Sequence, residues 1–168
     1  YTGYLGSDRQ IAIVSDYIDT FKKPGTKVIV DPAMADGGKL YAGFDKFFAS
    51  KMKDLCKKAD IILPNISEAA FLTDSAYPGE EAKEEEIKAL LLKLSKLGAR
   101  LSVITGVSFS DGTFGFIGYD NESKKIIQFG TPKVNMRSHG TGDIFASTFT
   151  GAVSSGYSEL DSLVIASK

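Results

Sequence analysis

The chain has 168 residues, 43% of them hydrophobic, which is enough to bury one substantial core, so we predict a single domain over residues 1–168. Twenty basic and twenty-one acidic residues leave a formal net charge of -1, which excludes a strong electrostatic footprint for nucleic acid or an anionic membrane. The single cysteine, Cys56, excludes an intrachain disulfide. Because the sequence shows no signal segment and no apolar run of bilayer length, we expect a cytoplasmic protein.

Strand and helix patterns alternate along the chain. Residues 1–6 are typical of a strand end and a turn, and Ser7 is a suitable N-cap for a helix whose apolar residues recur at helical spacing up to Phe21. Because the sequence begins within a strand pattern and ends within a helix pattern, we expect the domain to be incomplete at both ends. The later predicted strands are residues 27–30, 60–63 and 101–105 and the two arms of a hairpin, 113–119 and 124–130, and the predicted helices are residues 44–59, 65–72, 87–97 and those after residue 140.

Polar residues directly follow each of the three buried strands. Strands spaced by helices of this length predict an α/β fold of the doubly wound class, with a mainly parallel sheet, helices on both faces and a β-hairpin towards the C-terminus. In such a sheet the carboxyl ends of the strands lie on one edge, and ligands bind in the crevice outside it. The residues that we expect to converge there are Asp31, Asp36, Asn65, Glu68, Thr105 and Gly106.

Four of these side chains carry hard oxygen donors. The carboxylates of Asp31, Asp36 and Glu68 and the amide oxygen of Asn65 suit Mg²⁺, which is usually held by one or two carboxylates together with waters and substrate phosphates. The alternative is that Asp31 and Asn65 only cap the loops after their strands, as Asp and Asn often do.

The segment "HGTGDIFAS" precedes an apolar helix rich in small residues. Gly140 and Gly142 would let backbone N–H groups at the helix start approach a phosphate closely. Asp143 would then accept the proton of an attacking alcohol as a general base. The alternative is an ordinary helix start, with Thr141 as the cap and Asp143 as a first-turn acid favoured by the helix dipole. We interpret His139 as a positioning residue.

Two common phosphate-binding motifs are excluded. The chain has no G-x-x-x-x-G-K-[ST] segment, so it is not a P-loop protein. Phe145 occupies the position where a dinucleotide fingerprint needs its third small residue, which argues against a Rossmann dehydrogenase.

Five blocks occur in the order seen in the ribokinase-like superfamily, and the chain resembles its vitamin kinases, pyridoxal/pyridoxamine kinase most of all. The resemblance implies ATP-dependent phosphorylation of the 5′-hydroxymethyl group of a B6 vitamer, with Mg²⁺, and in many members a monovalent cation such as K⁺. It also implies a homodimer. The blocks are "YTGYLGS", "VDPAMADGGKLY", "ADIILPNISEAAFL", "VITGV" and "HGTGDIFAS".

Carried over residue by residue, the resemblance implies a role for each matched position. Asp143 matches the catalytic base, and residues 140–142 match the anion hole. Tyr4 matches the tyrosine that lines the pyridine pocket. Asn65 and Glu68 match the N-x-x-E motif that organises Mg²⁺. Asp31 and Asp36 match acids that face cation and phosphate. Thr105 and Gly106 match the loop that touches nucleotide phosphates.

Three other functions remain open at this point. Hydroxymethylpyrimidine (phosphate) kinases carry similar blocks but commonly have cysteine where Asp143 stands. A non-catalytic protein that binds a nucleotide or a vitamin would be expected to lose Asp143, Asn65 or Glu68, which are all present. A sugar kinase of the same superfamily is disfavoured by the blocks "YTGY" and "GGKLY".

Overall fold

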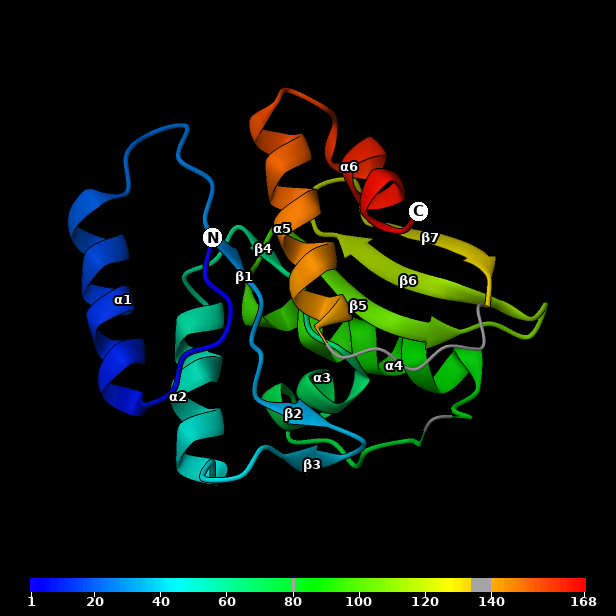
Figure 1. The fold of residues 1–168 in the computed structure, drawn as a ribbon, viewed down its shortest axis with the longest axis horizontal. Coiled ribbons are helices and arrows are strands. Elements are labelled where there is room, and N and C mark those ends of the chain that lie inside the picture. Colours follow the sequence, from blue (N-terminus) through cyan, green and yellow to red (C-terminus); the bar gives the residue numbers. More distant parts are fainter. Residues whose placement is uncertain (80, 134–139) are drawn as a thin grey trace.

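A five-stranded sheet lies between two layers of helices in the computed structural model, which describes residues 1–79, 81–133 and 140–168 (Figure 1). The strand order is β1-β4-β5-β6-β7, with β1, β4 and β5 parallel and β5, β6 and β7 antiparallel. The predicted α/β fold and its hairpin are therefore confirmed. The strands are β1 (Ile29–Val30), β4 (Ile61–Ile62), β5 (Leu101–Ser108), β6 (Thr113–Asp120) and β7 (Lys125–Pro132).

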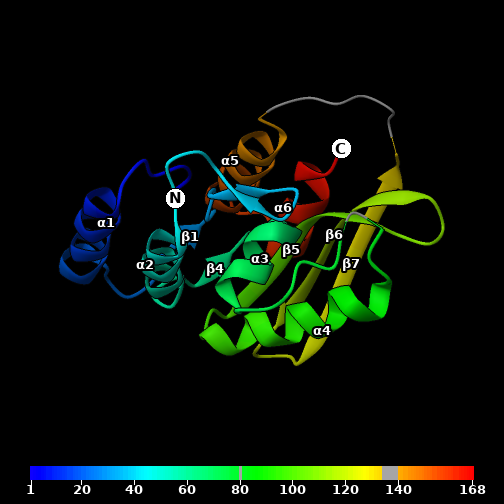
Figure 2. The same ribbon diagram turned by 90° about the horizontal axis from the view of Figure 1, so that it is seen from below.

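The helices cover both faces of the sheet, as the sequence predicts (Figure 2). Successive residues of each buried strand point to opposite faces, so Ile29 and Ile61 pack in one core cluster while Val30 and Ile62 pack in the other. One layer consists of α5 (Thr141–Ser154) and α6 (Glu159–Ala166), and the other of α1 (Asp8–Phe21), α2 (Lys46–Cys56), α3 (Ile66–Leu72) and α4 (Glu84–Leu94), which a short 3₁₀ turn (Ser95–Leu97) follows.

The helix starts follow from local capping. Ser7 caps α1 as predicted, because its hydroxyl accepts a hydrogen bond from the Gln10 backbone N–H at 3.3 Å. Helix α2 begins two residues later than predicted. Asp45 is its N-cap and accepts a hydrogen bond from Phe48 N–H at 2.9 Å. In the described part of the chain, no helix combines the length and the apolar character that crossing a membrane would need.

One element was not predicted. The loop after β1 contains a small antiparallel hairpin, β2 (Ala35–Asp36) and β3 (Lys39–Leu40). Gly37 and Gly38, with φ of 54° and 75°, form its two-residue turn, which requires positive φ at both positions. The hairpin presents Asp36 beside the carboxyl ends of the parallel strands.

Candidate active site at the strand ends

The three polar segments that follow the parallel strands meet at one edge of the sheet. Asp31 follows β1 directly, and Asn65, three residues after β4, forms a parallel bridge with Thr105 of β5. The N-terminal residues pair alongside β1 and so lie next to Asp31. Thr2 N–H donates to the Ile29 carbonyl at 3.0 Å, and the Thr2 carbonyl accepts from Asp31 N–H at 2.9 Å. The structure therefore brings together segments that lie far apart in the sequence.

Asn65 and Glu68 form a reciprocal cap at the start of α3. The Asn65 side-chain oxygen accepts from Glu68 N–H at 2.9 Å, and one Glu68 carboxylate oxygen accepts from Asn65 N–H at 2.8 Å. The other Glu68 oxygen accepts from Met34 N–H at 3.1 Å, and the Asn65 amide donates to the Ala35 carbonyl at 2.8 Å. The pair thus joins α3 to the loop that carries Asp36. Asn65 can therefore cap the helix and also serve at the site.

Two carboxyl groups are buried close together at this edge. Glu68 and Asp31 are 3% and 6% exposed. Burial raises the pKa of Glu68 from 4.5 to about 8, with a further increase from the Asp31 charge and an opposing decrease from backbone N–H donors. Burial likewise raises the pKa of Asp31 from 3.8 to about 7, and the charge of Asp143 adds to this increase. Both carboxyl groups therefore keep their protons up to near-neutral pH, and a bound cation would favour their ionised forms.

We call Asp31, Asp36, Glu68 and Asp143 the carboxylate cluster. Two tyrosines that the sequence did not assign to the site lie beside it. The Tyr1 hydroxyl donates a hydrogen bond to Asp31, and burial raises its pKa to about 12. Burial also raises the pKa of Tyr41, which follows β3, to about 12. The carboxylates whose charges raise the Tyr41 pKa further are those of Glu68, Asp36, Asp31 and Asp143. Tyr41 therefore lies within range of the charges of all four predicted acids.

Helix α5 presents an open start to the same site. Gly140 is its N-cap with φ of 80°, and this glycine has no side chain to form a capping hydrogen bond. The expectation that Thr141 would act as the cap is wrong, because Thr141 is the first helical residue. Asp143 is exposed, and a Cβ added at Gly3 would stand 3.8 Å from its carboxylate oxygen, so Asp143 faces the N-terminal segment. His139, the predicted positioning residue, lies outside the described residues.

Thr105 and Gly106 lie where β5 departs from regular pairing with β6. The ladder register shifts between Thr105 and Val107, and Gly106 at this bulge is exposed with φ of 72°. The Thr105 backbone N–H donates to the Pro64 carbonyl at 2.9 Å. The bulge thus exposes backbone beside Asn65. The contact of this loop with nucleotide phosphates stays a prediction.

Tyr4 belongs to a stack of aromatic rings at the side of the site. Its ring stacks on Phe44 with centroids 5.7 Å apart, and Phe44 stacks on Phe48 at 3.8 Å. Tyr4 is 60% exposed, whereas Phe48 is 5% exposed. We call Tyr4, Phe44 and Phe48 the aromatic column.

The oxygen donors at this edge bear on the predicted Mg²⁺. In residues 1–79, 81–133 and 140–168, no three acidic, histidine or cysteine side chains are arranged to enclose a metal ion. Both Glu68 oxygens are engaged by backbone N–H groups, which leaves the exposed Asp36 and the buried Asp31 as the available carboxylates. This set fits Mg²⁺, which binds through one or two carboxylates and keeps its other positions for waters and phosphates.

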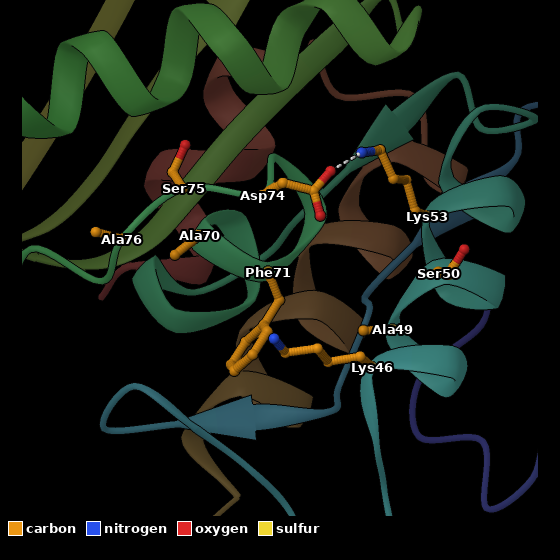
Figure 3. A pocket seen from close by; sticks show the side chains of 9 residues that line it. All are labelled: Lys46, Ala49, Ser50, Lys53, Ala70, Phe71, Asp74, Ser75 and Ala76. Atoms are coloured by element: carbon orange, nitrogen blue, oxygen red, sulfur yellow. Dashed lines mark hydrogen bonds and ion pairs between the residues drawn. The ribbon is translucent and has the colours of Figure 1, made fainter.

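A separate cavity of about 460 Å³ lies between α2 and α3, away from the predicted site residues (Figure 3). Lys53 and Asp74 form an ion pair of 2.6 Å across it, and Phe71 and Lys46 lie further along it. None of the predicted site residues lines this cavity.

Solved structures share this fold. A proposed phosphomethylpyrimidine kinase from Bacteroides thetaiotaomicron superposes with a TM-score of 0.91 at 37% sequence identity, covering 99% of this chain and 57% of that one. Pyridoxal kinase from Lactobacillus plantarum superposes with a TM-score of 0.87 at 30% identity, covering 98% of this chain and 57% of that one. The fold is that of the α/β small-molecule kinases.

The family follows from the sequence match. The model of the phosphomethylpyrimidine kinase family matches residues 1–168, and the chain belongs to that family. The thiamine biosynthetic bifunctional enzyme TH1 of Arabidopsis thaliana is 27% identical over 99% of this chain and 31% of its own length. Pyridoxal kinase PdxY of Leifsonia xyli subsp. xyli is 28% identical over 89% of this chain and 52% of its own length. The chain thus spans about a third of one of these curated relatives and about half of the other.

Proposed function

We propose that this chain carries the phosphoryl-transfer site of an ATP-dependent kinase that phosphorylates the 5′-hydroxymethyl group of pyridoxal, pyridoxamine or pyridoxine. The observation that carries the proposal is the position of Asp143, exposed at the open start of α5 and close enough to Asp31 for its charge to raise the Asp31 pKa. Crystals of the Bacteroides thetaiotaomicron protein, 37% identical to this chain, contain pyridoxal, which supports a B6 vitamer as acceptor.

In the proposed reaction, Asp143 accepts the proton of the acceptor hydroxyl as that oxygen attacks the γ-phosphorus of ATP. A bond forms between the acceptor oxygen and the γ-phosphorus, and the bond from the γ-phosphorus to the β–γ bridging oxygen breaks, so that ADP leaves. Backbone N–H groups of residues 140–142 donate to the transferring phosphoryl group. Because these donors are fixed before the reaction, they stabilise its charge without reorganisation.

The carboxylate cluster is proposed to hold Mg²⁺ on the phosphate side. Asp36 and Asp31 would bind it directly or through water, and Glu68 would hold Asn65 and the Met34 backbone in place. Bound Mg²⁺ would neutralise charge on the β- and γ-phosphates. Thr105 and Gly106 would contact the nucleotide phosphates from the β5 bulge.

A second acceptor is supported by the family itself. The family model is that of phosphomethylpyrimidine kinase, and TH1 is a thiamine biosynthetic enzyme. Hydroxymethylpyrimidine and its phosphate are therefore the alternative acceptors, and the same phosphoryl-transfer site would serve them.

The test is ADP release by the full-length gene product with ATP and Mg²⁺, with each B6 vitamer and hydroxymethylpyrimidine as acceptor. We expect turnover of a vitamer to fall by about 10² to 10⁴ in Asp143→Ala. Asp8→Ala is the matched control, because Asp8 is also an exposed first-turn acid of a 14-residue helix. Turnover of the pyrimidine alone would overturn the B6 assignment. Activity that survives in Asp143→Ala would overturn the assigned base, and nucleotide binding without turnover of any acceptor would indicate a non-catalytic protein.

A further inference from the structure

The aromatic column links the protein core to the surface beside the site. Phe48 in α2 is buried at its inner end, and the Phe44 ring lies almost parallel to it, with an interplanar angle of 7° and centroids 3.8 Å apart. The Tyr4 ring stacks on Phe44 at an interplanar angle of 28°, with centroids 5.7 Å apart. Phe44 is thus the middle ring, with one neighbour fixed in the core and one exposed.

The inner two rings are held by backbone contacts as well as by packing. Phe48 N–H donates to the Asp45 side chain at 2.9 Å, which is the N-cap contact of α2. Phe44 N–H donates to the Tyr41 carbonyl at 3.1 Å. Tyr4, by contrast, lies in the segment before α1 and is 60% exposed. Its ring stacks on Phe44 and also lies against Gly6, where a Cβ would stand 3.6 Å from it.

The column stands next to the carboxylate cluster. The Tyr41 ring is 6.4 Å from the Phe44 ring, centroid to centroid, and the charges of all four clustered carboxylates act on the Tyr41 hydroxyl. Gly3, which precedes Tyr4, is the residue that Asp143 faces. The exposed Tyr4 ring, one residue beyond the backbone that Asp143 faces, offers a stacking surface to an alcohol carried on a flat ring.

We infer that Phe44 is a positioning residue, which fixes the Tyr4 ring as the surface against which the planar ring of the acceptor stacks. The inference rests on the proposed function. An exposed side chain that is free to change rotamer must be ordered when a ligand binds, and that ordering weakens binding. Stacking on Phe44 orders the Tyr4 ring beforehand, and Phe48 in turn fixes Phe44.

The test is a double-mutant cycle on Tyr4→Leu and Phe44→Leu in the full-length protein. Calorimetry without ATP gives the Kd of pyridoxal, and steady-state kinetics give kcat and the two KM values. We expect Phe44→Leu to raise the Kd and KM of pyridoxal about threefold to tenfold, the scale of one aromatic pair, with kcat and the KM of ATP within about twofold of wild type. In a Tyr4→Leu background, Phe44→Leu should add nothing.

Two further variants separate positioning from simple packing. Phe44→Tyr keeps the stacked ring and should restore the wild-type Kd. Phe47→Leu is the matched control, because Phe47 is the neighbouring phenylalanine of α2, is 58% exposed and packs with Lys51 rather than with the column. If Phe44→Leu fails to fold, as judged by circular dichroism, Phe44→Met removes the ring while keeping most of its volume.

The outcomes distinguish this inference from the proposed function. An unchanged Kd in Phe44→Leu, additive effects in the cycle, or an equal effect of Phe47→Leu would overturn the inference even if turnover is normal. Coupled losses of pyridoxal binding in a protein that turns over no acceptor would support the inference and overturn the proposed function. A protein that binds neither a B6 vitamer nor hydroxymethylpyrimidine would overturn both.

Discussion

The parallel and antiparallel parts of the sheet are built in different ways. Strands β1 and β4 have two residues each, and the polar residues Asp31 and Asn65 follow them within three positions. Strands β5, β6 and β7 have eight residues each and pair along their whole length, apart from the bulge at Gly106. The short strands leave backbone free to meet ligands and side chains, whereas the long ladder satisfies its own backbone. We therefore expect changes in the parallel part and at the β5 bulge to affect activity, and changes elsewhere in the antiparallel part to affect stability alone.

Glu68→Ala should lower both activity and stability, because Glu68 belongs to the proposed site and also accepts hydrogen bonds from buried backbone. Removing its carboxylate leaves the N–H groups of Asn65 and Met34 buried without their acceptor. Unsatisfied buried donors cost about 1–3 kcal/mol each, so we expect the free energy of unfolding to fall by about 3 kcal/mol, together with kcat. Urea denaturation and the ADP-release assay measure the two effects.

The matching change in the antiparallel part is Gly115→Ala. A Cβ at Gly115 would lie 2.0 Å from the Phe129 carbonyl oxygen, so β6 and β7 must move apart. We expect a loss of about 2 kcal/mol in stability with kcat unchanged at a temperature where the variant is folded. A large fall in kcat here, or an unaffected kcat in Glu68→Ala, would contradict the separation.

The buried carboxyl groups predict an unusual pH dependence of stability. In the folded state the pKa values of Asp31 and Glu68 are raised to about 7 and about 8, from 3.8 and 4.5. Between about pH 4 and pH 8 the folded state therefore binds more protons than the unfolded state, and stability falls as the pH rises through this window. We expect a lower Tm at pH 8.5 than at pH 5.5, and a smaller difference in Asp31→Asn.

The effect of Mg²⁺ on the Tm should also depend on pH. The cluster carries its full negative charge only when Asp31 and Glu68 have lost their protons, so Mg²⁺ should raise the Tm more at pH 8.5 than at pH 5.5. Asp60→Asn serves as the control, since Asp60 pairs with Lys22 on the surface. An equal Mg²⁺ effect at both pH values, or in Asp31→Asn as in wild type, would argue against a cation at the cluster.

The smallest expected change in stability comes from two glycines of α5. A Cβ would meet nothing within 4 Å at either Gly142 or Gly151, and alanine favours a helix over glycine by up to about 1 kcal/mol. Both Gly→Ala variants should therefore be slightly more stable in urea. Only Gly142→Ala should lose activity, by roughly tenfold, because its methyl group would occupy the approach of the phosphate to the helix start. Equal activity of the two variants would remove Gly142 from the anion hole.

Periodicity and turn residues were enough to predict most of the elements, because each depends on local contacts. Ser7 could be predicted as a cap, and the convergence of Asp31 with Asn65 followed from the properties of parallel sheets. The β2–β3 hairpin was missed because its strands are too short to show a pattern, although Gly37 and Gly38 carry its turn signal. The Asn65–Glu68 capping box was visible as N-x-x-E.

Tyr1 and Tyr41 could not be assigned to the site from the sequence. Nothing in their local pattern distinguishes them from the exposed Tyr17, and only tertiary packing brings them to the carboxylates. The sequence favours core or packing positions for Phe44, Phe47 and Phe48, which is wrong for Phe47, because that ring is 58% exposed. Burial of Phe48 confirms a core position for that ring, but the stacking of Tyr4 on Phe44 depends on two segments that the sequence does not show to be adjacent.

Asn65 has a consequence for the order in which the molecule folds. Its side chain caps α3 and donates to the Ala35 carbonyl, and its backbone bridges to Thr105, so one residue joins segments that lie 30 and 40 positions away. Contacts of such wide sequence separation carry a large loop-closure entropy and form late. Asn65→Ala should therefore accelerate unfolding in stopped-flow experiments while leaving the refolding rate almost unchanged. The catalytic edge would then be the last part of the protein to assemble and the first to open.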